Sequence, residues 1–114
     1  MNFETTGLDL SRFLSYLSAR QEAVAANIAN ADTPGYKTRD VGMPADFSSV
    51  LNQQMMPEVQ DAPGLTSRND GNNVSMDREA RLLAETTIRF NLAAQMLRAQ
   101  IKDIRSAIEE GRSS

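Results

Sequence analysis

Two stretches of the chain repeat their apolar residues at helical spacing. In the first stretch, between residues 8 and 31, apolar side chains recur every three or four residues, which places them on one face of a helix. Pro34 ends this pattern, because proline donates no backbone hydrogen bond and clashes with the preceding turn of a helix. We expect an amphipathic helix at about residues 8–31, with a packing face made by Leu10, Phe13, Leu14, Leu17, Val24 and Ile28.

The second stretch is longer and more regular. Apolar and small residues alternate in steps of three and four, a heptad seam held for about four repeats, and this pattern is typical of a helix that lies along another helix. Ser75 or Asp77 can cap its start and Gly111 can end it. We predict a helix at about residues 77–110, whose seam consists of Ala80, Leu83, Thr87, Phe90, Ala94, Leu97, Ile101, Ile104 and Ile108.

A second apolar row, Ile88, Leu92 and Met96, lies off this seam. One partner helix cannot cover both rows, so the pattern indicates at least two partners for the second helix. The alternative is a modest exposed patch of the kind that every protein carries.

Residues 32–76 separate the two helices and contain all four prolines and four of the six glycines. We expect this segment to be mostly irregular and ordered by a partner. The stretch Asn69–Asn73 is typical of a tight turn, and Phe47–Leu51 can form a brief helix or strand on docking. The fold class that follows is all-α, in a single domain spanning residues 1–114.

The junction after the first helix has an unusual composition. Nine residues from Ala23 to Ala31 carry no charge and mostly small side chains, which favours a helix end surrounded by other helices, with Asn27 and Asn30 hydrogen-bonded there. The alternative is that alanine serves helix propensity alone. Pro34 and Gly35 then reverse the chain, and Tyr36 can lay its ring against the helix while its hydroxyl finds a partner.

Composition excludes several classes of function. Only 24 of the 114 residues are Leu, Ile, Val or Phe, so a self-sufficient core is doubtful, and a net charge of −3 disfavours nucleic acid and anionic membranes as partners. With no His and no Cys, the chain lacks the usual metal ligands and nucleophiles. We expect no catalysis, no metal, no cofactor and no small-molecule substrate. No stretch has the pattern of a membrane span or of a cleaved secretory signal.

The string Ala26–Lys37 (ANIANADTPGYK) resembles the N-terminal signature of bacterial flagellar rod, hook and related axial proteins. The short length of the chain and the stretch Asp70–Glu79 (DGNNVSMDRE), which leads into the last helix, are similar to subunits of the proximal rod. This resemblance covers both helices and little of the segment between them.

The resemblance implies a structural role and a set of partners. Such proteins are exported by the flagellar type III apparatus without a cleaved signal peptide and assemble into the rod, which crosses the periplasm. Their terminal helices pair as an antiparallel coiled coil. The implied partners are copies of the chain itself, other rod proteins and the proteins of the rod base and membrane ring. Subunit packing is expected from the first-helix face above and from Phe90, Leu97, Ile101, Ile104 and Ile108, and the junction is expected to be shaped by Asn27, Asn30, Pro34, Gly35 and Tyr36.

Two alternatives remain open at the level of the sequence. A different axial component would share the signature but usually carries more chain between its helices. A small coiled-coil adaptor or export chaperone would instead be folded and oligomeric on its own.

Overall fold

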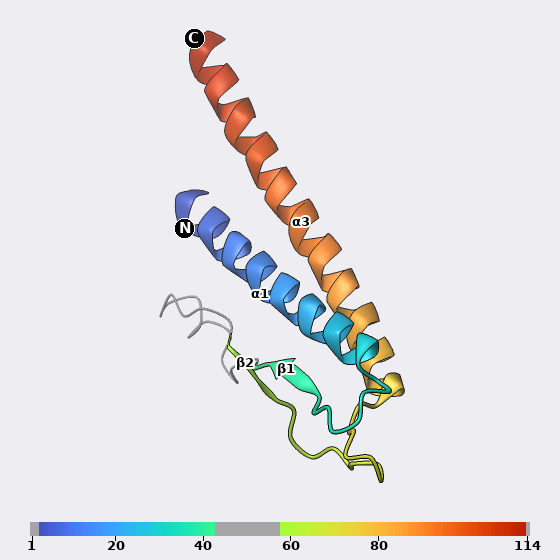
Figure 1. Ribbon diagram of the computed structural model, residues 1–114. Coiled ribbons are helices and arrows are strands. Elements are labelled where there is room, and N and C mark those ends of the chain that lie inside the picture. The colour runs from blue at the N-terminus through green and yellow to red at the C-terminus, as the bar shows by residue number, and fades with distance from the viewer. Residues whose placement is uncertain (1–2, 43–57, 114) are drawn as a thin grey trace.

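The computed structural model describes the backbone of residues 3–42 and 58–113, and the side chains of residues 9–42 and 58–112. Two long helices dominate this part of the chain: α1 spans Phe3–Ala29 and α3 spans Met76–Ser113. Two short strands lie between them in sequence, β1 at Arg39–Val41 and β2 at Val59–Asp61 (Figure 1).

The two helices lie side by side and run in opposite directions (Figure 1). Gln21 of α1 donates a hydrogen bond to the Thr87 hydroxyl of α3. About two turns further along the pair, near the end of α1 and the start of α3, Asn27 contacts Glu79. Continuing this register along both helices places Phe3 opposite residue 103 or so. The last ten residues of α3 therefore have no part of the described α1 beside them.

The start of α3 follows one of the two expected caps, but its end does not follow the expected stop. Ser75 precedes the helix, and its hydroxyl accepts a hydrogen bond from the backbone N–H of Arg78 at 3.3 Å. Gly111 lies inside α3, which continues to Ser113. A glycine ends a helix when it adopts a positive φ, and Gly111 does not.

The face of α3 that contacts α1 differs from the predicted heptad seam. The buried residues of α3 are Glu79, Leu82, Thr86 and Ala93, whereas Leu83, Ile101 and Ile108 of the seam are 39%, 44% and 52% exposed. The residues of α3 that contact α1 thus lie one position earlier in the sequence than the residues of the predicted seam. Glu79 lies on the observed face and accepts a hydrogen bond from the buried Asn27 amide, a contact that the spacing of apolar residues does not reveal.

The small core forms where α1, α3 and β1 meet. Tyr16, Leu17, Ala23 and Val41 are buried together, and Phe13, Ala19 and Phe90 pack against them. The core thus combines residues from both long helices with one residue of a strand.

The segment between the helices is more ordered than the sequence predicts. Strands β1 and β2 pair antiparallel with Asp40 opposite Gln60, and the N–H of Ala62 donates to the carbonyl of Thr38 at 2.8 Å. β1 packs against α1 of the same chain, because the side chain of Val41 is buried there. The described part of the segment is therefore not wholly irregular, while the stretch Phe47–Leu51 lies outside the described residues.

Candidate functional site

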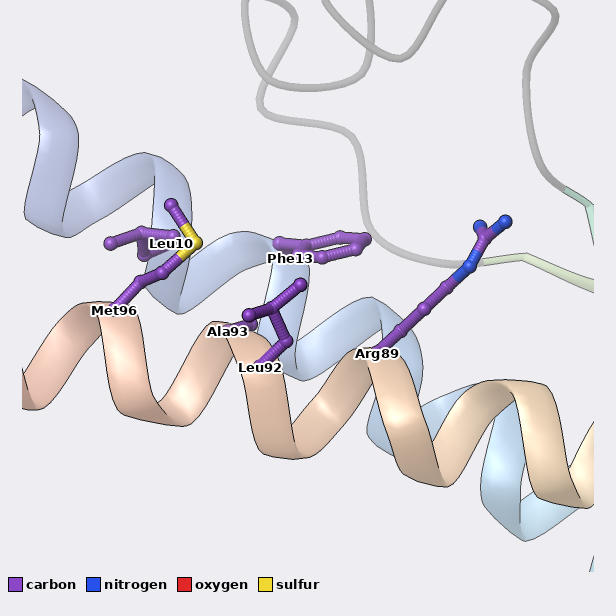
Figure 2. Close-up of a pocket in the computed structure, with 6 residues that line it drawn as sticks. All are labelled: Leu10, Phe13, Arg89, Leu92, Ala93 and Met96. Atoms are coloured by element: carbon purple, nitrogen blue, oxygen red, sulfur yellow. The ribbon is translucent and has the colours of Figure 1, made fainter.

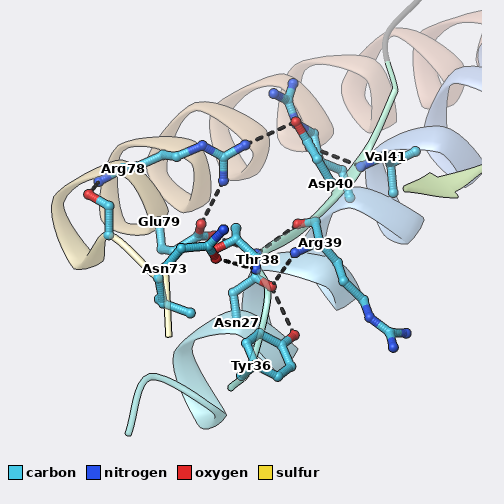
Figure 3. Close-up of polar contacts among 12 residues, drawn as sticks. Asn27, Tyr36, Thr38, Arg39, Asp40, Val41, Asn73, Arg78 and Glu79 are labelled. Carbon is cyan, nitrogen blue, oxygen red and sulfur yellow. Dashed lines mark hydrogen bonds and ion pairs between the residues drawn. The ribbon is translucent and has the colours of Figure 1, made fainter. Parts of the chain in front are cut away.

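The residues that carry chemistry gather at one end of the helix pair. There the C-terminal part of α1, the strand β1 and the segment leading into α3 meet (Figure 3). We call this region the junction.

Asn27 is the centre of the junction and is fully buried. Its amide nitrogen donates to the carbonyl of Arg39 at 2.8 Å and to a carboxylate oxygen of Glu79 at 3.1 Å. Its amide oxygen accepts from the hydroxyl of Tyr36 at 3.0 Å and from the backbone N–H of Arg39 at 2.9 Å (Figure 3). An asparagine side chain has two donor hydrogens and two acceptor lone pairs, so one residue satisfies its full capacity while joining α1, β1 and α3.

Glu79 is a charged residue with no exposed surface, and an ion-pair chain compensates its charge. A guanidinium nitrogen of Arg78 lies 2.6 Å from Glu79, and the other terminal nitrogen lies 3.0 Å from Asp40. Arg20 of α1 approaches the second oxygen of Asp40 at 3.9 Å. The charges alternate in sign along the chain of contacts, so the network is neutral as a whole. A buried ion is tolerated only when it is paired and hydrogen-bonded in this way.

Asn72 closes the C-terminal end of α1 and is also fully buried. Its amide nitrogen donates to the carbonyl oxygens of Asn30 and Thr33, both at 2.9 Å, and its amide oxygen accepts from the N–H of Val74 at 2.8 Å. Both carbonyls belong to the turn that follows α1, where each also accepts a backbone hydrogen bond. Asn72 thus fixes this turn from a segment about 40 residues away.

Two turns contact each other beside this cap. Gly35 and Gly71 both adopt the left-handed conformation, with φ of 76° and 86°, and the N–H of Gly35 donates to the carbonyl of Asp70 at 2.8 Å. A Cβ atom at Gly71 would lie 3.3 Å from the Cα atom of Gly35. Pro34 is exposed at the tip of the first turn. The Asn69–Asn73 stretch forms the predicted turn, with the N–H of Gly71 bonded to the carbonyl of Arg68.

Asn30 and the basic residues after the turn make shorter-range contacts. The Asn30 amide donates to the carbonyl of Ala26 at 2.9 Å. Lys37 reaches the Ser67 hydroxyl at 2.9 Å. Arg39 is exposed, and its side chain points away from the buried network (Figure 3).

Tyr16 links the core to β1. Its hydroxyl donates to the carbonyl of Val41 at 3.1 Å, and burial raises the pKa of this tyrosine above 10.0. A buried phenolate would lose hydration, so the neutral, hydrogen-bonded form is favoured.

The predicted packing residues fall into three groups. Leu17 and Val24 are buried within this chain, so they belong to its own core and are not exposed for neighbouring subunits. Seven are half-buried, and these are Leu10, Phe13, Leu14, Ile28, Phe90, Leu97 and Ile104. Ile101 and Ile108 are exposed.

Apolar side chains also line a groove on one side of the helix pair. It has a volume of about 310 Å³ and is lined by Leu10, Phe13, Arg89, Leu92, Ala93 and Met96 (Figure 2). Arg89 is the one charged residue of its lining, and its guanidinium pairs with Glu85 at 3.0 Å. The other described residues of this lining are apolar.

Sequence reasoning missed the buried charges of the junction. The charged residues Asp40, Arg78 and Glu79 and the amide of Asn72 were not predicted to be site residues. Asn72, Arg78 and Glu79 nevertheless lie within Asp70–Glu79, one of the stretches on which the resemblance rests. A charged residue near the start of a helix is ordinarily exposed, and only a contact distant in sequence reveals that Glu79 is not.

Within residues 3–42 and 58–113, no group of three acidic residues is placed to hold a metal ion. None of the helices described there is long and apolar enough to cross a membrane.

Comparisons with known proteins identify relatives of this chain. The family model described as "Flagella basal body rod protein" matches residues 14–37, which include Asn27 and Tyr36. The chain is 32% identical to the flagellar basal body rod protein FlgB of Salmonella typhimurium, across 86% of this chain and 88% of that protein. It is 29% identical to FlgB of Escherichia coli with the same coverage, and 30% identical to FlgB of Aeromonas hydrophila across 84% and 86%.

These likenesses extend over both helices and the segment between them, at a level of identity that shows common descent. The chain is a structural component of the flagellar basal body, and it belongs to the FlgB family of flagellar basal body rod proteins.

Proposed function

We propose that this chain polymerises through its two long helices as a subunit of the proximal rod, and so forms part of the drive shaft of the flagellum. The observation that carries this proposal is that large aliphatic side chains are exposed on two sides of α3. Ile88, Leu92, Met96, Ile101 and Ile108 are between 44% and 68% exposed. Large exposed apolar surfaces mark sites of protein contact.

The junction supports the same role in a different way. It joins the two helices through contacts within one chain, centred on Asn27 and flanked by Asn30, Pro34, Gly35 and Tyr36. A shaft that carries torque needs subunits whose parts keep their relative positions, and a buried network of hydrogen bonds and ion pairs provides such rigidity. The pairing of α1 with α3 as an antiparallel coiled coil is part of this proposal.

The wider assignments follow from the family and remain part of the proposal. The chain would act in the periplasm, after export by the flagellar type III apparatus without a cleaved signal peptide. Its partners would be further copies of itself, other rod proteins and the proteins of the rod base and membrane ring.

Deletion of the gene tests the proposal directly. We expect loss of swimming and basal bodies that stop at the membrane ring in electron micrographs, with both defects restored by a plasmid copy. Normal basal bodies in the deletion strain would overturn the assignment to the proximal rod.

A further inference from the structure

Two rows of apolar side chains on α3 are left uncovered by α1. The first row follows the heptad seam and consists of Leu83, Ile101 and Ile108, which are 39%, 44% and 52% exposed. The second row consists of Ile88, Leu92 and Met96, which are 68%, 58% and 53% exposed. Both rows are therefore available to other helices.

The two rows lie on opposite sides of α3. An α-helix turns by roughly 100° per residue, which places the centres of the two rows roughly half a turn apart. The face that contacts α1, with Glu79, Leu82, Thr86 and Ala93, lies between them. Because α1 occupies this third face, it cannot cover either row.

Each row borders a groove that α1 helps to form. The second row continues into the groove of about 310 Å³ beside Leu10 and Phe13 (Figure 2). On the other side of the helix pair, a wider groove of about 610 Å³ is lined by Leu14, Ser18 and Phe90, among others. The groove beside the second row is lined almost entirely by apolar residues, and an apolar groove bordered by a helix accepts another helix. The wider groove also contains Ser11, Ser15, Ser18 and Glu22, so polar groups form much of its lining.

We propose that copies of this chain pack side by side with their α3 helices parallel, so that the first row of one copy contacts the second row of the next. This inference rests on the proposed polymerisation and specifies its contact surfaces. The two surfaces of each contact differ, so the contact is heterologous and repeats without closing on itself. The residues of the first row have heptad spacing, which is the spacing by which one helix packs along another.

Along the C-terminal half of α3, the charges beside the two rows are complementary. Arg98, Arg105 and Arg112 flank the first row, whereas Asp103 flanks the second. Nearer the start of the helix, Arg89 also borders the second row, where it pairs with Glu85 of its own chain. In parallel copies at the same height, Arg105 of one copy lies within two residues, about 3 Å along the axis, of the level of Asp103 in the next. Lys102 and Glu109 lie between the rows and favour neither side.

Cysteine cross-linking tests this contact, because the chain contains no cysteine of its own. Ala99 lies three residues after Met96 and so continues the second row. The variant carrying both Ile101→Cys and Ala99→Cys would replace the native chain in the bacterium that encodes it, and isolated basal bodies would be oxidised. We expect a ladder of products at multiples of 12.5 kDa. The matched controls are the two single variants. Each should remain monomeric, because its cysteine contacts a surface of the next copy that carries no cysteine.

Each other result would contradict the proposal. A dimer from one single variant would show a symmetric contact in place of a heterologous one. A product whose mass is not a multiple of 12.5 kDa would show that a different protein contacts the row. Swimming cells whose double variant gives no ladder would overturn the docking surface and leave the rod assignment intact, since the deletion experiment tests that assignment separately.

Charge reversal gives a second test that needs no cysteine. Arg105→Glu alone and Asp103→Arg alone each place like charges across the contact, and each should reduce swimming in soft agar. The double variant restores opposite charges between copies and should recover swimming. Residues two apart do not face each other on one helix, so recovery cannot arise within a single chain. Equal swimming in all three variants, or no recovery in the double variant, would refute the contact.

Discussion

The two ends of the helix pair are held by different kinds of interaction. At the junction, buried polar groups such as Asn27, Glu79 and Asn72 find all their partners within the chain. At the other end, α3 extends past α1 and exposes Ile101 and Ile108. Polar networks demand exact geometry, whereas apolar surfaces tolerate any partner of the right shape. The junction can therefore be complete in a single chain, while the open end is completed by neighbours.

The largest predicted effect comes from breaking the ion-pair network of the junction. Glu79→Ala leaves Arg78 without its buried partner and removes one acceptor of the Asn27 amide, so we expect a loss of about 3–5 kcal/mol in the free energy of unfolding. Urea denaturation of the purified chain measures this loss. The matched control is Glu85→Ala on the same helix, whose partly exposed pair with Arg89 is worth about 0.3–0.5 kcal/mol. Equal losses in the two variants would show that burial of Glu79 is unimportant.

A substitution in the turn tests the close contact of the two backbones. Gly71→Ala forces a side chain into the left-handed region, which costs about 1–2 kcal/mol, and adds a Cβ atom 3.3 Å from the Cα of Gly35. Gly64→Ala is the control, because its φ is 77° but no atom lies within 4 Å of the added Cβ. We expect Gly71→Ala to be the more destabilising of the two in urea denaturation. The reverse order would mean that the turns separate without cost.

The hydroxyl of Tyr16 provides a smaller and pH-dependent effect. Tyr16→Phe removes the hydrogen bond to the Val41 carbonyl and should cost about 1 kcal/mol at neutral pH. The pKa of Tyr16 is raised in the folded chain, so its contribution is complete below pH 10.0 and is lost as the pH rises through the folded pKa. Unfolding of the native chain and of the variant would be compared from pH 8 upward. A pH dependence that is identical in both would exclude Tyr16 as its source.

The smallest effect on stability is expected at the open end. Ile101 is 44% exposed in the single chain, so Ile101→Asp should change the free energy of unfolding by less than about 0.5 kcal/mol. The same variant should abolish swimming, because it places a charge in the proposed contact between copies. Lys102→Asp, one residue away and between the two rows, should leave swimming intact. Normal swimming with Ile101→Asp would remove Ile101 from the subunit contacts.

The candidate site was predictable only in part. Asn27, Asn30, Gly35 and Tyr36 stand out because small, uncharged residues followed by Pro34 are unusual at a helix end. The Asn27 side chain has the expected hydrogen bonds to other elements, whereas the Asn30 amide donates to Ala26 in its own helix. Glu79 and Asp40 could not be recognised in the same way. Acidic residues are ordinarily solvated, and their burial depends on Arg78 and Arg20, whose positions relative to them follow from the fold.

The sequence by itself determined the local features of this protein. The apolar periodicity sets the existence of two long helices, Pro34 sets the end of the first, and the rows of α3 follow from residue spacing alone. These features depend on interactions within a few residues. The tertiary structure decided which face of α3 meets α1, because that face is set by contacts between residues distant in sequence, such as Asn27 and Glu79, which are 52 positions apart. It also decided that Leu17 and Val24 belong to the core of the chain while Ile101 and Ile108 remain exposed, since burial depends on which helix lies opposite and not on hydrophobicity.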